Sequence, residues 1–378
     1  MAYVELVDNE TLQVPRALER AVADASIAGA SHAAKVGILR VVTSAWAQPS
    51  HSTRMNLADA HSDLLMELVF FRGEEQPFAS RWLPKLEAGG VQLQVCTLFS
   101  DDRDLPELAL RTALLGVAEF DRAVAESPSV VAVRSAADLD DALAPGRRGL
   151  MLSIEGMEPL GYDPGLIDVF CTLGVRMASL TWNRRNPFAD GVAEAPSGGL
   201  SQIGRSLVDR MAGLPIAFDL AHANEGTFFE VLERTGDRPV LVSHALSRAL
   251  VDIPRNLTDD QVRAIADRDG VVGLMALPFV VHESEWTIAR LIDHVDHLAQ
   301  TIGVRHVCLG GDFARQLERS GAFGAAAMAA GTEIEGLAGP EDYPRLFEAL
   351  SDRGYSDADL RAIASENLLR VLRRTLPG

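Results

Sequence analysis

Residues 215–244 read PIAFDLAHANEGTFFEVLERTGDRPVLVSH, and this stretch indicates how most of the chain folds. An apolar run at 215–220 is followed by a segment of helical periodicity at 226–234 and by a second apolar run at 239–243. A strand, a helix and another strand in this order are typical of parallel strands joined by helical crossovers. Both apolar runs lead to a histidine, His222 after the first and His244 after the second.

The same alternation extends along the chain and predicts eight strands. We expect them at Asn56–His61, Val91–Leu98, Gly149–Ile154, Arg176–Trp182, Pro215–Leu220, Pro239–Ser243, Val271–Leu277 and His306–Gly310. Amphipathic segments between them include Ile203–Ala212, Gly226–Arg234, Thr258–Arg268 and Ile288–Ile302. Eight strands with helical crossovers predict an α/β fold, a (β/α)8 TIM-like barrel. This prediction rests on the number and order of the strands, because the sequence contains no visible repeat.

The composition is that of an acidic globular protein. The 378 residues include 35 Lys and Arg against 53 Asp and Glu, which gives a formal net charge of −18. Hydrophobic residues make up 47% and charged residues 23%, close to the average of globular proteins. The acidic balance argues against a nucleic-acid partner, because phosphate binding needs a basic face. No run of about 18 apolar residues is present, so we expect no membrane-spanning helix.

The cysteines and the N-terminal residues indicate the compartment. Cys96, Cys171 and Cys308 lie far apart and form no C-x-x-C pair, so we expect buried thiols rather than a disulfide framework. Residues 1–20 contain several charges and lack the continuous apolar core of a secretory signal. The sequence therefore predicts a cytoplasmic protein.

Residues 1–55 differ in character from the rest of the chain. The segment 12–47 is rich in alanine and helical in period, and residues 48–53 (QPSHST) are typical of a linker. We expect an N-terminal helical extension and linker at 1–55, followed by one barrel domain at 56–378.

Residues that can bind a metal stand at the ends of five predicted strands. In extended chain, residues two apart face the same side, so His61 and Asp63 can hold one ion together. The complete set is His61, Asp63, Glu155, His222, His244 and Asp312. One such residue alone is more often a hydrogen-bonded core residue. Six at the carboxyl ends of barrel strands, where barrel enzymes place their active sites, predict a metal centre.

The ligand chemistry favours zinc, and the number of ligands favours two ions. Imidazole nitrogens and carboxylate oxygens without a thiolate suit zinc or another divalent first-row metal. Three histidines and two carboxylates are too many for one catalytic ion with an open position, but they fit two ions that share a carboxylate. The only lysines are Lys35 and Lys85, so a carbamylated lysine cannot bridge the ions from a mid-barrel strand. Glu155 is well placed to do so.

The sequence resembles the membrane (renal-type) dipeptidases, a family of zinc metallopeptidases with a barrel of the metallo-dependent hydrolase type. The resemblance runs from about Asn56 to Arg374. It rests on DAHSD (59–63), LEAGGV (86–91), IEG (154–156), LGVR (173–176), DLAH (219–222), VSHALSRAL (242–250), PRNLTD (254–259), GDF (311–313) and NLLRV (367–371), in this order and spacing.

The resemblance implies a role for each of the candidate residues. It makes His61 and Asp63 ligands of one zinc and His222 and His244 ligands of the second, with Glu155 as the bridge. It further implies that Asp312 transfers the proton and that Arg255 receives the terminal carboxylate of the substrate, a natural partner for a guanidinium. The implied reaction is hydrolysis of dipeptides, including those with a C-terminal D-residue, by a metal-bridging hydroxide. Relatives commonly form dimers, so the resemblance is compatible with a homodimer.

Two positions leave alternatives open. Without the family motif, Arg255 is better explained by a surface salt bridge to Asp259 or Asp260. Trp182 stands where better-studied relatives carry a histidine that steadies the oxyanion, and an indole N–H donates one hydrogen bond but carries no charge. We expect Trp182 to line the substrate site. Either Asn183, Arg184 or Arg185 is the substitute donor, or zinc alone stabilises the oxyanion.

Two further histidines and two alternative functions also follow from the sequence. His294 and His297 have a helical spacing that can bind metal, but a solvated outer face of a barrel helix explains them better. The altered residues Trp182 and Phe313-Ala314-Arg315 motivate a metal-dependent amide or lactone hydrolase of a dedicated pathway as an alternative. A non-catalytic binding barrel is a third hypothesis, and the intact set of ligands argues against it.

Overall fold

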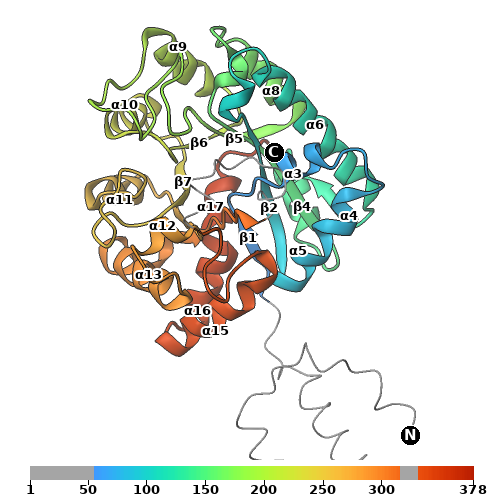
Figure 1. Cartoon of the computed structure of the whole chain (residues 1–378), viewed down its shortest axis with the longest axis vertical. Helices are drawn as coiled ribbons and strands as arrows, with labels where there is room; N and C mark the ends of the chain where they lie inside the picture. The colour runs from blue at the N-terminus through green and yellow to red at the C-terminus, as the bar shows by residue number, and fades with distance from the viewer. Residues whose placement is uncertain (1–54, 316–330) are drawn as a thin grey trace, which may run out of the picture. The chain divides into compact units, whose positions relative to one another are not determined.

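Nine parallel strands form one sheet, and eight of them close into a barrel surrounded by helices (Figure 1). The computed structural model describes residues 55–315 and 331–378. The strands are β1 (Leu57–Asp59), β2 (Val91–Phe99), β3 (Val130–Ala132), β4 (Arg148–Glu155), β5 (Val175–Ser179), β6 (Ala217–Asp219), β7 (Val240–Ala245), β8 (Val272–Leu274) and β9 (Val307–Leu309). The eight expected strands are all present, although several are shorter. The predicted (β/α)8 barrel is therefore confirmed.

The barrel closes through β4, whose two edges are used differently. β2 pairs with β4 along one edge, from Leu93 opposite Gly149 to Phe99 opposite Glu155. The other edge is shared, because β3 pairs with residues 148–150 and β5 with residues 152–155. β3 is thus a ninth strand outside the ring, and the sequence analysis missed it. A strand of three residues is too short to show a periodicity.

The helices alternate with the strands and cover the outside of the barrel. Helix α13 has the limits expected from the sequence, and α11 begins at a capping box in which Thr258 accepts a hydrogen bond from the Gln261 backbone N–H. The helices are α3 (Leu64–Phe70), α4 (Pro77–Arg81), α5 (Leu83–Gly89), α6 (Ala109–Glu126), α7 (Ala136–Ala142), α8 (Leu166–Leu173), α9 (Gln202–Met211), α10 (Glu225–Thr235), α11 (Asp259–Asp267), α12 (Pro278–Val281), α13 (Ile288–Ile302), α15 (Tyr343–Arg353), α16 (Asp357–Arg361) and α17 (Asn367–Arg373).

The interior of the barrel is filled by side chains and sealed at one end. One buried cluster combines residues from seven of the eight barrel strands, such as Leu93, Met151 and Leu241, and Val271 just before β8, with Leu368 and Val371 of α17. Asn367, at the start of α17, donates hydrogen bonds to the carbonyls of residues 304 and 307, which precede and begin β9. Helix α17 therefore closes the barrel at the amino ends of the strands, which leaves the carboxyl ends for a site.

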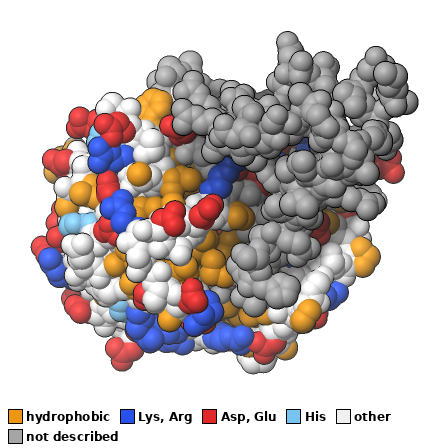
Figure 2. Space-filling model, turned by 90° about the horizontal axis from the view of Figure 1, so that it is seen from below, with side chains coloured by type: hydrophobic (Ala, Val, Ile, Leu, Met, Phe, Trp, Pro, Cys, Tyr) orange, Lys and Arg blue, Asp and Glu red, His pale blue; other side chains and the backbone are white. Residues whose placement is uncertain are grey.

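The predicted helical extension and linker at 1–55 lie, except for Met55, outside the described residues. None of the described helices combines the length and the apolar character needed to cross a membrane. On the face drawn in Figure 2, basic and acidic side chains are interspersed around hydrophobic ones.

Candidate metal centre

The six metal-capable residues predicted from the sequence all lie at the carboxyl ends of barrel strands. Five strands supply them: His61 and Asp63 follow β1, Glu155 ends β4, His222 follows β6, His244 lies in β7 and Asp312 follows β9. All six side chains are buried. Residues separated by up to about 250 positions in the chain thus meet in one small region, because parallel strands end at the same face of a barrel.

Glu155 lies at the centre of this group and belongs to two sets of possible ligands. Its Oε1 atom lies 3.0 Å from Nε2 of His222 and 3.3 Å from Nε2 of His244. A second set joins Glu155 to His61 and Asp63, whose Nε2 and Oδ1 atoms lie 3.8 Å apart. One carboxylate shared by two ligand sets has the arrangement that a pair of ions with a common bridge requires.

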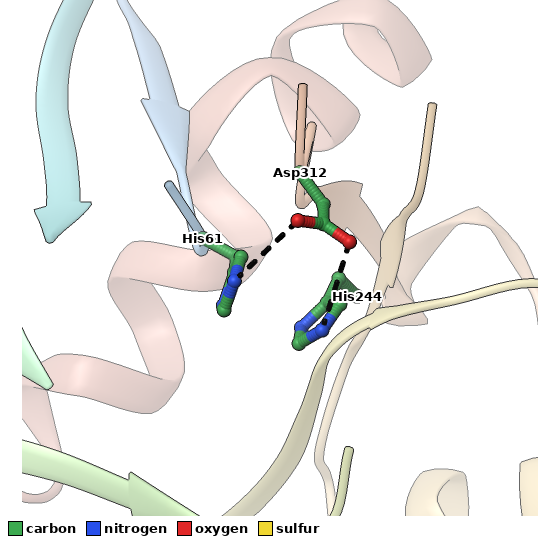
Figure 3. A group of neighbouring side chains, drawn as sticks. All are labelled: His61, His244 and Asp312. Carbon is green, nitrogen blue, oxygen red and sulfur yellow. Dashed lines mark ion pairs between the residues drawn. The ribbon is translucent and has the colours of Figure 1, made fainter. Parts of the chain in front are cut away.

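Asp312 links the two halves of the site (Figure 3). Its Oδ1 atom lies 3.7 Å from Nε2 of His61, and its Oδ2 atom lies 3.9 Å from Nε2 of His244. The two imidazole rings are stacked, with centroids 3.7 Å apart. Asp312 has a backbone φ of 47°, in the left-handed region that residues other than glycine rarely adopt. His222 has a φ of 61°. Such backbone strain is frequent at functional sites.

Hydrogen bonds to the Nδ1 atoms determine which ring nitrogen of each histidine faces the site. Nδ1–H of His222 donates to Oδ1 of Asn183 at 2.7 Å. The Ser153 hydroxyl donates to the Cys96 carbonyl, so its oxygen accepts the proton of the Thr97 hydroxyl. The Thr97 oxygen in turn accepts from Nδ1–H of His61 at 3.3 Å. Each Nε2 atom therefore presents a lone pair to the centre, as a metal ligand must.

His244 reaches the same state through a different partner. Its Nδ1 atom lies 2.7 Å from the Ser243 hydroxyl oxygen, and that hydroxyl donates to Oδ2 of Asp219 at 2.5 Å. The Ser243 proton is thus committed to Asp219, so Nδ1–H of His244 is the donor and Nε2 is left with its lone pair.

Several buried polar atoms of the site have no suitable hydrogen-bond partner among the described residues. Nε2 of His222 and Nε2 of His244 lie 2.9 Å apart, and with Nδ1 protonated on both rings neither can donate to the other. Nε2 of His61, Oδ1 of Asp63 and Oε1 of Glu155 are buried and make no hydrogen bond with any residue in the described ranges. A cation at the centre would satisfy these atoms, and the nitrogen and oxygen donor set fits zinc or a similar first-row ion.

The pKa values of the site residues reflect the same crowding. Burial, with a smaller contribution from Arg255, lowers the pKa of His61 to about 3. Burial raises the pKa of Asp63 to about 7, and burial together with the neighbouring carboxylate of Asp63 raises the pKa of Glu155 well above its ordinary value. A bound cation would interact with the lone pairs of the neutral imidazoles and would favour the ionised carboxylates. It would therefore offset the free-energy cost of burying both kinds of group.

Arg255 lies at this centre and not on the surface. Its side chain is buried, one terminal nitrogen donates to the His244 carbonyl at 2.8 Å, and its Nε has no hydrogen-bond partner among the described residues. Asp259 and Asp260, the partners in the alternative interpretation, instead pair with Arg263. The structure therefore excludes the surface salt bridge.

Trp182 forms an aromatic wall beside the centre. Its ring lies 5.2 Å from the ring of Phe99 and 6.1 Å from that of His222, measured between centroids. The Arg184 guanidinium lies 5.2 Å from the Trp182 ring and is held by Asp102 and Glu158. Arg185, whose side chain is exposed, pairs with the buried carboxylate of Asp190. Of the substitute donors considered, Asn183 is already engaged with His222.

One interpretation of the remaining histidines was wrong. His294 does not lie on a solvated face but is fully buried, where Nδ1 accepts a hydrogen bond from the Ser247 N–H and Nε2 donates to the Val281 carbonyl. Its neighbour His297 pairs with Asp259 at 2.8 Å. The loop of residues 247–257 and helix α12 cover this side of α13, which the sequence pattern of α13 alone does not reveal.

Four residues that orient the ligand imidazoles were not predicted to do so. They are Thr97, Asn183, Asp219 and Ser243, which belong to the hydrogen-bond chains described above. The signal available for Asp219 and Ser243 was their place in the motifs DLAH (219–222) and VSH (242–244).

Comparison with known proteins places this site in a family context. A family model described as membrane dipeptidase (peptidase family M19) matches residues 50–376. An uncharacterised dipeptidase of Schizosaccharomyces pombe is 33% identical over 232 residues, which are 60% of this chain and 53% of that protein. Dipeptidase aclJ of Aspergillus oryzae is 34% identical over 234 residues, 61% of this chain and 52% of that protein. The chain thus spans about half the length of these curated relatives.

A solved structure supports the same relationship over a longer range. A metallopeptidase from Rhodobacter sphaeroides, bound to a phosphinate mimic of the dipeptide L-Ala-D-Ala, is 25% identical with a TM-score of 0.75. The match covers 85% of this chain and 99% of that one. The similarity therefore includes nearly the whole of the related barrel.

Proposed function

Because this chain belongs to the membrane dipeptidase family, peptidase family M19, we propose that it is a binuclear zinc dipeptidase that hydrolyses the peptide bond of short dipeptides. The observation that carries this proposal is the position of Glu155 in two sets of buried ligands, one with His61 and Asp63 and one with His222 and His244. The proposal assigns one zinc to each set. Zinc ions held there would activate a water molecule and polarise the carbonyl of the scissile bond.

Asp312 is the residue that we assign to proton transfer. Its two carboxylate oxygens face the two halves of the site, at 3.7 Å from His61 and 3.9 Å from His244. Burial and the charge of Asp63 raise the pKa of Asp312 well above its ordinary value, which suits a group that takes up and releases a proton. In this role it would accept the proton of the attacking water and deliver it to the leaving amine.

Arg255 is the residue that we assign to the substrate carboxylate. Its guanidinium is buried, uses one nitrogen on the His244 carbonyl and leaves Nε without a partner in the described structure. A buried guanidinium with a free N–H beside a hydrolytic centre favours an anionic group close to the scissile bond. A substrate carboxylate bound by Arg255 would lie close to the scissile bond, which favours peptides with one residue beyond that bond.

The substrate side chains that we propose follow from the ligand of a related structure and from the position of Trp182. The Rhodobacter sphaeroides metallopeptidase binds a mimic of L-Ala-D-Ala. We therefore include dipeptides with a C-terminal D-residue among the substrates. Trp182 and Phe99 present an aromatic surface next to His222, which favours an apolar substrate group at that side.

Hydrolysis of a panel of L,L- and L,D-dipeptides by zinc-loaded protein tests the proposal. Turnover that disappears on chelation and in Glu155→Gln is the expected result. The same panel contains lactones and N-acyl amino acids, because the replacement of the oxyanion histidine by Trp182 favours an amide or lactone hydrolase as the second candidate. Zinc-dependent turnover of these compounds alone would replace the dipeptidase assignment, and absence of both turnover and bound metal would overturn the enzyme proposal.

A further inference from the structure

Two buried carboxylates that are not in the ligand sets occupy equivalent positions at the site. Oδ1 of Asp219 accepts hydrogen bonds from the Ala221 and Ser243 backbone N–H groups at 3.0 and 2.9 Å. Oδ1 of Asp59 accepts from the His61 and Gly311 backbones at 3.1 and 3.0 Å. Each carboxylate therefore joins the carboxyl ends of two neighbouring strands, β6 to β7 and β1 to β9.

The second oxygen of each carboxylate accepts from a hydroxyl, and here the two differ. Oδ2 of Asp59 accepts from the Tyr343 hydroxyl at 2.6 Å, and within the described residues no hydrogen bond leads from Tyr343 to a ligand imidazole. Oδ2 of Asp219 accepts from the Ser243 hydroxyl at 2.5 Å, and the same hydroxyl oxygen lies 2.7 Å from Nδ1 of His244. Only Asp219 is thus connected through a hydroxyl to a residue of the metal centre.

We propose that Asp219 and Ser243 are positioning residues that fix the tautomer of His244 for metal binding, an inference that rests on the proposed two-metal site. Asp219 orients the Ser243 hydroxyl, whose oxygen then accepts the Nδ1–H of His244 and leaves Nε2 free for the ion. The other two histidines end their hydrogen bonds on neutral groups, the Asn183 amide and, through Thr97 and Ser153, a backbone carbonyl. Among the three ligand histidines, His244 is the one whose tautomer depends on a carboxylate.

In this chain of hydrogen bonds Nδ1–H of His244 donates to Ser243 and the Ser243 hydroxyl donates to Asp219. This direction makes Asp219→Asn a specific test. The oxygen of the new amide stays on the two backbone N–H groups, because an NH2 group there would face two donors. Its NH2 group then donates to the Ser243 oxygen, and the Ser243 hydroxyl turns to donate to Nδ1 of His244. His244 carries its proton on Nε2 in this arrangement, so metal binding there first has to move that proton and becomes weaker, while the size of the side chain is almost unchanged.

Asp59→Asn is the matched control. It makes the same chemical change at a carboxylate with the same pair of backbone donors, but its hydroxyl partner, Tyr343, contacts no ligand imidazole in the described structure. Zinc affinity and stoichiometry are measured by competition with a chromophoric chelator, and thermal unfolding of the metal-free proteins reports their folding. The visible spectrum of bound Co²⁺ reports the ligands without any turnover assay.

Asp219→Asn is expected to lose about 10- to 100-fold in affinity for one of two zinc ions and to show an altered Co²⁺ spectrum, while Asp59→Asn keeps both. Equal zinc affinity and equal spectra of the two variants would overturn the proposal that Asp219 acts on His244 through Ser243. If Asp219→Asn does not fold, Ser243→Ala against Tyr343→Phe repeats the comparison with the same expectation. Wild-type protein that binds no zinc would instead refute the proposed function, so the two failures are distinguishable.

Discussion

The Nε2 atoms of His222 and His244 lie 2.9 Å apart at the carboxyl ends of the neighbouring strands β6 and β7. Asn183 and Ser243 hold the Nδ1 atoms of the two rings, so both lone pairs point into the same space beside Glu155. Two buried lone pairs at this distance repel each other unless a cation lies between them and the carboxylate. This relationship is the basis of the predictions that follow.

Zinc is expected to stabilise the protein, and magnesium is not. An ion that binds only the folded state adds about 2.7 kcal/mol to the free energy of unfolding at a concentration of 100 times its Kd. Mg²⁺ prefers oxygen ligands in octahedral geometry and should gain little from three imidazoles. Thermal unfolding of metal-free protein with added Zn²⁺ or Mg²⁺ measures this. An equal rise in Tm with both ions would contradict a site built on histidines.

Glu155→Gln should lose bound zinc and hydrolysis together, because it removes the charge shared by both ligand sets. Partners outside the ligand shell cost up to about 100-fold, so the loss for a shared ligand should exceed that. Metal content and dipeptide turnover are measured on the same preparations. Glu119→Gln is the control, since Glu119 is a buried carboxylate on helix α6 beside Arg122. A similar loss in both variants would point to a general effect on folding.

Arg255→Met should weaken the use of free dipeptides but not of dipeptide amides. Removing one partner of a buried charged pair costs about 2–4 kcal/mol, a factor of about 30 to 1,000 in kcat/KM. The variant also loses the hydrogen bond to the His244 carbonyl, but that effect is common to both substrates. The ratio of the two kcat/KM values therefore isolates the carboxylate contact. The assignment of Arg255 fails if the ratio is the same in wild type and variant.

Trp182→His should raise kcat for dipeptides. A single oxyanion donor is worth about 100-fold or more in rate, and a histidine there would supply a donor that can carry charge. Trp182→Phe keeps an aromatic ring against Phe99 without any donor. Steady-state kinetics on one dipeptide separate the two variants. If Trp182→His is no faster than Trp182→Phe, the position has no role in stabilising the oxyanion.

His294 should make the protein less stable in mild acid. Burial lowers the pKa of His294 from its ordinary value of 6.5 to about 4. The unfolded chain therefore binds the proton more readily, so this contribution is fully present above pH 6.5 and is lost as the pH falls towards 4. The shift corresponds to at most about 3 kcal/mol.

The comparison with His294→Gln isolates this residue from the histidines of the metal centre. Glutamine can accept from the Ser247 N–H and donate to the Val281 carbonyl without titrating. Urea unfolding at pH 7.5 and pH 5.0 should show a smaller loss of stability in the variant than in the wild type. An identical pH dependence of the two proteins would assign the acid sensitivity to other groups.

The order of strands and the ligands at their ends could be predicted because both are local features of the sequence. Each apolar run followed by Asp, Glu or His reports a strand and its carboxyl end, and His61, Glu155 and His244 all fall at such ends. The family motifs added the expected role of Arg255, and the barrel places this residue at the metal centre. Strand β3 was not predicted because three residues are too few to show a periodicity. The burial of His294 was not predicted because residues of other segments cover it.

The eight-stranded barrel and the chemical identity of the ligands could be predicted from local features of the sequence, namely apolar periodicity and residue type. Which ring nitrogen of each histidine faces the centre could be known only from the folded arrangement. That choice depends on hydrogen bonds between residues of different strands, such as Asn183 with His222 and Asp219 with Ser243. Such partners meet because parallel strands end at one face of the barrel, and no local pattern reports the direction in which a hydroxyl proton points.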